Sequence, residues 1–479
     1  MVPGRRGNKM NSFATGASGL TRRKALFGVL GTSALASACG ADEAKPAAPA
    51  PTQAAALAPK PSVAATTAPA VAPTTAPSAQ PVTIKYITEP GRVDSGVKDA
   101  VNAYNALGRK ITVELEGVPG NFGEKVLTLG AAGSLPELTH SHPRDYHPWR
   151  TGGLLVPLDD RLKIEKDAAD LVPAALDYWL MDGQRWAVPY NLSVQNMYFN
   201  REIFEKAGQK TPDEYEKEGK WTWETYLDLA RKLTSGSGDT KVFGCVWMAT
   251  FLDIQLGVIW PFGGDLWDKE RKKTVLDSKA ALDAIQFQAD LAGKYAVSPN
   301  DEEWKQFASA PSATWGAAFG AGRAAMELQP NDSLAPHVLA STFRKGMAPM
   351  PKGPGGRIVR GLSVGVHLFK GSKQTDAAWN FAMYHSGKET EKLMLDRHLT
   401  LPWRISTQAA IATAMPLKDW ESSAAYGENM KAVRPTPYVA KFADINKVYN
   451  DAYIPVRAGQ KTAVQMMVEL KPQIEELLK

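Results

Sequence analysis

A polar loop rich in histidine is the part of this 479-residue sequence best equipped for binding chemistry. The segment THSHPRDYHPW, residues 139–149, places three histidines beside one arginine and one aspartate. Such side chains form hydrogen bonds, so we predict that His142, Arg144 and Asp145 contact a polar ligand, with an ordinary surface loop as the alternative. Zinc is a weaker interpretation, because His140 and His142 would point in opposite directions along an extended chain. No HExxH motif supports it, and we predict no metal site.

Several tryptophans and a glycine-rich turn could complete a binding site. A tryptophan ring offers a large flat surface that suits the C–H face of a sugar, although packing in the core is an equal alternative. In PFGGDLWD, residues 261–268, two glycines would let the backbone approach a ligand closely, unless they simply form a tight turn. A tyrosine and an asparagine that follow a Val-Pro dipeptide can both form hydrogen bonds. The ligand contacts predicted here are Trp149, Trp247, Trp260, Trp403, Tyr190, Asn191, Gly264 and Asp265.

The charge balance argues against a nucleic-acid-binding protein. Six of the 56 basic residues lie within residues 1–38, which contain no acidic residue, so 50 basic and 50 acidic residues remain. A nearly neutral chain lacks the basic surface expected for nucleic acid. There are two cysteines, and Cys245 lies in the apolar run KVFGCVWM, where we predict a small buried core residue rather than a reactive thiol.

The first 81 residues predict an export signal followed by a tether. Three basic residues at 22–24, in a twin-arginine-like order, precede an apolar run too short to span a bilayer. Cys39 then follows Ala-Ser-Ala, which resembles a bacterial lipobox, although leucine stands four rather than three positions before the cysteine. We expect a lipidated Cys39 on the outer face of the cytoplasmic membrane, with a secreted or free periplasmic protein as the alternative. Residues 39–81, rich in Ala, Pro and Thr, would form a semi-extended tether.

Alternating strands and helices must position these side chains. A strand at 82–88, a helix at 97–107 and a strand at 110–118 form a β-α-β opening, which favours an α/β domain on a largely parallel sheet. Thr222 is a predicted helix N-cap, because its hydroxyl can accept an unpaired backbone N–H. Further strands are predicted at 137–142, 187–200, 242–248, 324–328 and 362–369, and further helices at 221–235, 278–295 and 375–387.

An ordered series of short motifs from Val82 onward resembles the extracellular solute-binding proteins of family 1, the sugar-type receptors of ABC importers. The resemblance implies a periplasmic-binding-protein-like fold with two α/β lobes, joined by a hinge of crossing strands, and a ligand cleft between them. In relatives, the segments that hold Asn331 and Gly361 contribute ligand contacts, so we add both residues to the predicted site. The motifs are GGLLVPLDD (152–160), DGQRWAVPYNLSVQNMYFNREIFEKAG (182–208), PFGGDLWD (261–268), FGAGRAAM (319–326), GLSVGV (361–366) and LPWR (401–404).

The resemblance also implies a domain division and a function. Lobe 1 would comprise residues 82–190 and 324–365, and lobe 2 residues 191–323 and 366–479. The protein would be a monomer without a cofactor or catalytic activity, which captures a small solute, most simply a sugar or oligosaccharide, by hinge closure and delivers it to a permease. The alternatives are an exported glycosidase, with Asp145 and Asp265 as the carboxylate pair, and a surface adhesion module.

Overall fold

The computed structural model describes residues 80–90, 96–247, 251–307, 316–330, 336–415 and 417–479. All of them belong to one compact unit, Thr74–Lys479. The predicted export signal, Cys39 and Asn331 lie outside the described residues. Within those residues, no helix combines the length and the apolar character that crossing a membrane requires.

An eight-stranded mixed sheet organises the unit, in the order β2-β1-β3-β9-β6-β7 with β8 paired to β6 and β10 paired to β9. The predicted β-α-β opening is confirmed, since β1 pairs in parallel with β2 and with β3. The expectation of a largely parallel sheet is wrong beyond β3, because β9 runs antiparallel to both β3 and β6. The strands are β1 (Val82–Thr88), β2 (Ile111–Gly117), β3 (Leu138–Ser141), β6 (Val188–Asn200), β7 (Met326–Pro330), β8 (Lys345–Ala348), β9 (Val359–Leu368) and β10 (Val433–Arg434). A separate hairpin joins β4 (Leu180–Met181) to β5 (Gln184–Arg185).

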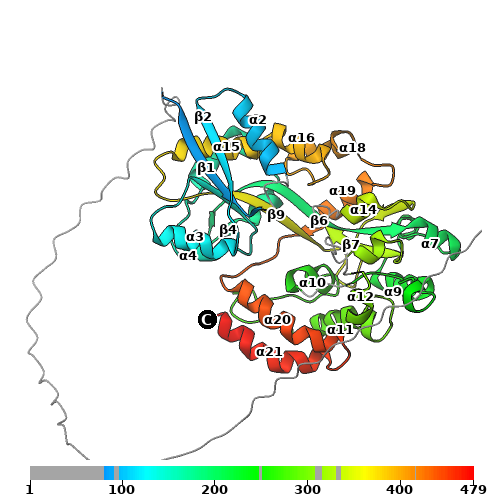
Figure 1. Cartoon of the computed structure of the whole chain (residues 1–479). Helices are drawn as coiled ribbons and strands as arrows, with labels where there is room; N and C mark the ends of the chain where they lie inside the picture. Colours follow the sequence, from blue (N-terminus) through cyan, green and yellow to red (C-terminus); the bar gives the residue numbers. More distant parts are fainter. Residues whose placement is uncertain (1–79, 91–95, 248–250, 308–315, 331–335, 416) are drawn as a thin grey trace, which may run out of the picture. The chain divides into compact units, whose positions relative to one another are not determined.

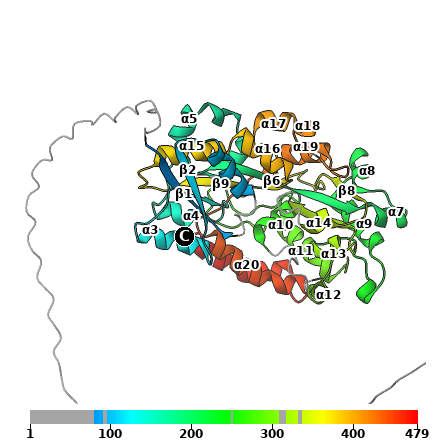
Figure 2. The same ribbon diagram turned by 45° about the horizontal axis from the view of Figure 1, so that its top comes forward.

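Helices pack against two different parts of this sheet. Figures 1 and 2 show α15 beside β1, and both views place α10, α11 and α20 together at some distance from it. The helices of the first group, of which α2, α6, α15 and α16 contact the strands, are α2 (Lys98–Ala106), α3 (Phe122–Ala131), α4 (His147–Thr151), α5 (Asp159–Ile164), α6 (Pro173–Asp177), α15 (Thr375–His385) and α16 (Lys388–Asp396). The others are α7 (Arg201–Lys206), α8 (Pro212–Lys217), α9 (Trp223–Leu233), α10 (Leu252–Ile259), α11 (Lys279–Gly293), α12 (Asp301–Lys305), α13 (Ala317–Gly320), α14 (Pro336–Ala340), α17 (Ile405–Ala409), α18 (Ile411–Ala414), α19 (Ser423–Lys431), α20 (Phe442–Arg457) and α21 (Ala463–Leu477).

The buried apolar side chains form two clusters, which we call the first core and the second core. The first core draws on residues 84–192 and 364–403, and the second mainly on residues 194–359 and 401–474. β6 passes from the first core at Leu192 to the second at Val194, and β9 passes back between them. Both strands are buried along their whole length, although each also carries polar side chains.

The lobe boundaries stay a prediction, and core membership suggests different ones. Residues 326–330, which the resemblance assigns to lobe 1, form β7 and pack in the second core. Residues 366–383, assigned to lobe 2, pack in the first core. A division that follows the cores would exchange these two segments.

Local predictions in the second core have mixed outcomes. Thr222 is the N-cap of α9, and its hydroxyl accepts from the N–H of Thr225 at 3.3 Å. The strand predicted at 242–248 is wrong over its described residues 242–247, because they form isolated bridges at Val242, Phe243 and Val246 rather than a ladder; Met248 lies outside the described residues. Cys245 within it is fully buried as predicted, and burial raises the pKa of its thiol to about 12. A thiol held neutral in this way is a poor nucleophile.

Candidate functional site

The four tryptophans predicted to stack on a ligand are used for packing in this structure. Each exposes at most 3% of its surface, and three of them donate their indole N–H to protein acceptors. These acceptors are Gly123 O for Trp149 at 3.2 Å, Asp265 Oδ1 for Trp260 at 3.0 Å and Ser386 O for Trp403 at 2.9 Å. A buried ring presents no face to a solute, so we do not carry Trp149, Trp247, Trp260 or Trp403 into the proposed site.

Tyr190 and Asn191 also point into the protein. The hydroxyl of Tyr190 bonds to Nδ1 of His140 at 3.0 Å, and its ring stacks on His385 with centroids 4.2 Å apart. Asn191 donates from Nδ2 to the carbonyl of Leu399 at 3.1 Å. These contacts hold β6 against the neighbouring segments, so both residues have a structural function here.

The glycines and Asp265 have packing functions that the sequence left open. A Cβ at Gly264 would lie 2.7 Å from the Cα of Ala281, so this glycine permits close approach of a helix rather than of a ligand. A Cβ at Gly361 would likewise lie 2.6 Å from the hydroxyl of Tyr178. Asp265 accepts from Trp260, from the N–H of Leu266 at 2.9 Å and from Arg434 at 2.6 Å. Its carboxylate therefore braces the turn after α10, and nothing in this arrangement favours a catalytic pair with Asp145.

Charged side chains from both cores meet at one place, which we call the junction cluster. Arg144 and Asp145 come from the turn between β3 and α4, and their side chains lie 3.4 Å apart. The facing residues are Asp253 on α10, Arg360 on β9 and Tyr438 after β10. Arg360 and Asp253 form a buried ion pair at 2.7 Å, and the hydroxyl of Tyr438 donates to the same Asp253 oxygen at 3.1 Å.

The electrostatic interactions of Arg144 and Asp145 with Asp253 indicate that the two sides of the junction cluster lie near each other. Burial opposes the charge of Arg144, but the carboxylates of Asp145 and Asp253 outweigh it and raise the pKa of Arg144. Burial also raises the pKa of Asp145, and Glu89 and Asp253 raise it further against the opposing effect of Arg144. The side chains of Arg144 and Asp145 nevertheless keep 40% and 35% of their surface accessible. They are recessed charged groups that a small solute can still reach.

Glu89 extends the junction cluster at the end of β1. Its Oε2 lies 2.5 Å from Nε2 of His140, and the hydroxyl of Thr88 lies 3.0 Å from the same nitrogen. His140 is fully buried and contacts Glu89 from the protein interior, whereas the Glu89 side chain stays 35% exposed to solvent. β1 and β3 are parallel neighbours, and ligands of open α/β sheets bind at the carboxyl ends of such strands. Glu89 and the residues 142–145 stand at those two ends.

Sequence reasoning found Arg144 and Asp145 but missed the residues that face them. His142, the third predicted residue of that loop, is buried beside them, and its carbonyl accepts the N–H of Asp145 at 3.0 Å. A signal for the missed residues was present. Asp253 is a lone charge in the apolar segment LDIQLGVIW, and Arg360 directly precedes the segment GLSVGV in a buried strand. A single charge in an otherwise buried element requires a partner, and such partners often lie at functional sites.

The arrangement suits a neutral, hydroxyl-rich solute. Carboxylates accept and guanidinium groups donate charge-assisted hydrogen bonds, which are about twice as strong as neutral ones. Among the described residues, no three His, Cys, Asp or Glu side chains are grouped as a metal site would require. Nothing in the donor set calls for a cofactor.

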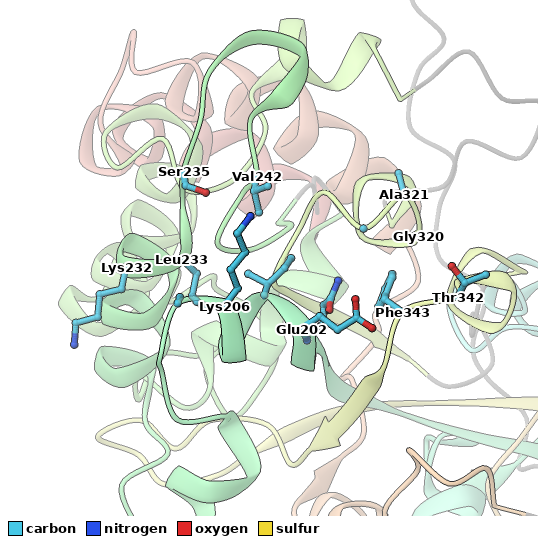
Figure 3. Close-up of a pocket in the computed structure, with 14 residues that line it drawn as sticks. Glu202, Lys206, Lys232, Leu233, Ser235, Val242, Gly320, Ala321, Thr342 and Phe343 are labelled. Carbon is cyan, nitrogen blue, oxygen red and sulfur yellow. Dashed lines mark hydrogen bonds between the residues drawn. The ribbon is translucent and has the colours of Figure 1, made fainter.

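A cavity of about 650 Å³ lies away from the junction cluster, between α7, the end of α9 and the turn after α13. Figure 3 shows Lys206 extending into it, with Glu202 and Phe343 on the other side. None of its lining residues belongs to the first core, so a molecule bound there could not bridge the two cores. The junction cluster is therefore the better candidate site.

The chain is similar to known binding proteins in sequence and in fold. A family described as "Bacterial extracellular solute-binding protein" matches residues 89–392. A binding protein of Brucella abortus is 25% identical over 299 residues, which cover 62% of this chain and 68% of that protein. Two solved structures have a TM-score of 0.70 at 19% identity. One is an ABC substrate-binding protein of Listeria monocytogenes in complex with cycloalternan, matched over 82% of this chain and 98% of that one. The other is the sugar-binding protein MalE of Xanthomonas citri, matched over 83% and 97%. At this level of identity the structural matches establish a periplasmic-binding-protein-like fold.

Proposed function

Because this chain belongs to the bacterial extracellular solute-binding proteins, we propose that it captures a sugar or oligosaccharide outside the cytoplasm for an ABC importer. The observation that carries the proposal is the junction cluster, which brings hydrogen-bonding charges from two separate cores to one place. The names of the Listeria and Xanthomonas proteins support a carbohydrate as the solute class.

A ligand that contacts both cores would link occupancy of the binding site to a change in protein conformation. A ligand shifts a conformational equilibrium only when it interacts differently with the two states. A solute held by the accessible Arg144 and Asp145 of one core, and contacting the facing segments around the buried Asp253 and Tyr438 of the other, would favour the closed state. β6 and β9 connect the cores and would act as the hinge. The closed monomer would then dock on the permease subunits of the importer.

Isothermal titration calorimetry with a panel of mono- and oligosaccharides tests the proposal. We expect saturable 1:1 binding of at least one sugar. Arg144→Gln and Asp145→Asn should each weaken that binding about 10- to 150-fold, since a hydrogen bond to a charged group contributes about 1.5–3 kcal/mol. Arg344→Gln is the matched control, because it also removes an arginine from an ion pair, with Glu205, but at an exposed position outside the site.

Two outcomes would contradict the proposal. The first is a folded protein that binds no sugar in the panel. The second is a sugar whose affinity falls equally in Arg144→Gln and Arg344→Gln, which would place the ligand elsewhere. Small-angle scattering with and without the bound sugar tests closure separately, since the radius of gyration should fall on binding.

We further propose that Cys39 carries a lipid anchor, so that residues 39–81 tether the binding domain to the outer face of the cytoplasmic membrane. Support comes from the lipobox-like segment and the tether composition. Lipid contributes about 0.8 kcal/mol per buried CH₂, so several chains suffice for stable attachment. Mass spectrometry of the mature N-terminus should find an acylated cysteine, and Cys39→Ser should release the protein from the membrane fraction. An unmodified N-terminus in the wild type would support the secreted alternative.

A further inference from the structure

A small cavity of about 80 Å³ lies behind Tyr438, and its walls come from both cores. Tyr146 and Tyr178 line it from the first core, and Tyr438 lines it from the second. Its volume exceeds the roughly 30 Å³ that one water occupies in the liquid. We call it the rear cavity, and its other lining residues include His147, Arg271 and Thr436.

His147 is a buried polar side chain that makes no side-chain hydrogen bond within the described part of the chain. Only 1% of the residue is exposed, and neither ring nitrogen has a hydrogen-bond partner among the described residues. Its ring packs against Tyr146, with centroids 4.4 Å apart, but that contact satisfies neither nitrogen. A buried polar group without a partner costs about 1–3 kcal/mol, so such groups in folded proteins are usually satisfied by water or an ion.

The charges around His147 favour an anion over a cation. Burial lowers the pKa of His147 to about 4, and Arg150 and Arg271 lower it further against the weaker opposite effect of Asp182. Arg150 is already paired with Asp182 at 2.5 Å. Arg271 has no carboxylate within ion-pair distance in the described part of the chain, and its guanidinium donates to the carbonyl of Tyr438 at 3.3 Å. The positive potential in the rear cavity is therefore not neutralised by the nearest side chains.

The backbone of Arg271 adds an independent indication. Its φ of 54° lies in the left-handed region, which a non-glycine residue rarely adopts. Strained backbone of this kind often occurs at ligand sites. Arg271 and the next residue, Lys272, are both exposed, but only Arg271 lines the cavity, so the strained position is the one that presents a guanidinium there.

We propose that the rear cavity binds one small tetrahedral oxyanion, sulfate or phosphate, between the guanidinium of Arg271, the imidazole N–H of His147 and the hydroxyl of Thr436. Asp177 also lines the cavity, but it pairs with Arg185 at 3.4 Å, so it does not cancel the charge of Arg271. This site shares Tyr438 with the junction cluster, but its proposed anion contacts are other residues, and it does not depend on the proposed sugar binding.

Calorimetric titration with sodium sulfate at constant ionic strength tests this site. We expect saturable 1:1 binding to the wild-type protein. Arg271→Gln should weaken it at least tenfold, whereas Lys272→Gln, which removes the same charge from the same turn, should change it less than twofold. Thr436→Val, a nearly isosteric change, should weaken it severalfold. Sulfate also stabilises any folded protein without binding to a specific site, and this general effect is the same in all variants, so differences between variants report the specific site.

The pH dependence gives a second test that a structural role would not reproduce. Sulfate does not titrate between pH 5 and 8, but a bound anion should favour protonation of His147, so sulfate affinity should rise as pH falls. The other titratable or charged groups facing His147 are Tyr146, Tyr178, Tyr438, Asp177, Asp182, Arg150 and Arg271. His147→Phe should abolish the rise. No saturable sulfate binding, or equal losses in Arg271→Gln and Lys272→Gln, would overturn the proposal. The titration contains no sugar, so its outcome is separate from that of the sugar panel.

Discussion

Breaking the buried ion pair between Arg360 and Asp253 should strongly reduce the stability of the protein. Their side chains are 4% and 2% exposed, and their charges lie 2.7 Å apart. At an effective dielectric constant of about 20, two charges about 3 Å apart attract by about 5 kcal/mol. Desolvation offsets much of this attraction, so the pair as a whole adds little. Removing one partner is different, because it leaves an uncompensated buried charge and costs about 3–5 kcal/mol.

We therefore expect Arg360→Met to lower the free energy of unfolding by about 3–5 kcal/mol in urea denaturation at pH 7, followed by circular dichroism. Tyr438→Phe should cost about 1.5–3 kcal/mol, because the tyrosine hydroxyl donates to the charged Asp253. The double variant Arg360→Met with Asp253→Asn should be clearly more stable than the sum of the two single losses predicts, since no charge is then left alone.

The exposed pair of Arg344 and Glu205 provides a matched control. Arg344→Met also removes an arginine from an ion pair, but both side chains are more than half exposed, so stability should hardly change. An Arg360→Met variant as stable as Arg344→Met would refute the reasoning. So would strictly additive losses in the double variant, because they would mean that the two charges do not compensate each other.

Three further predictions concern packing, capping and pH. Gly264→Ala should lower the free energy of unfolding by about 1–3 kcal/mol, since its Cβ would meet the Cα of Ala281 at 2.7 Å. Gly427→Ala, in open space on α19, should raise the free energy of unfolding by about 0.5–1 kcal/mol. Equal effects of the two variants in thermal unfolding would contradict this. Thr222→Ala should cost about 1 kcal/mol by removing the cap of α9, and Thr222→Ser should restore it. Burial lowers the pKa of His385 to about 3, so its protonation does not affect the free energy of unfolding above about pH 6.5 and lowers it by up to about 1.4 kcal/mol per pH unit between pH 6.5 and 3. His385→Phe should therefore flatten the pH profile of the urea midpoints. An unchanged slope would reject His385 as the cause.

Local sequence patterns placed several central elements of the fold. Strands β1, β2, β6 and β9 and helices α9, α11 and α15 lie where alternation or helical spacing predicted them. The strand predicted at 242–248 failed because its apolar run is that of a buried connecting segment, which periodicity alone does not distinguish from a strand. The direction of β9 was equally inaccessible, since no local feature records which neighbour a buried strand will pair with.

The candidate site was only half predictable. Arg144 and Asp145 could be found because a polar loop follows a strand, and that information is local. The tryptophans could not be assigned, because a large aromatic ring is as favourable in a core as on a ligand, and only the packed structure shows that these rings are buried.

What the sequence determined by itself is the composition of each element: which faces are apolar, where helices begin, and which loops carry charge. The tertiary structure decided which of those charges meet. Glu89, Arg144, Asp253, Arg360 and Tyr438 come from five separate segments, and no spacing along the chain relates them. Their proximity follows from β6 and β9, which pass through both cores and bring the two sets of loops together. Two charges interact only when they are close in space, and these charges come close only when the apolar surfaces of the two cores are buried.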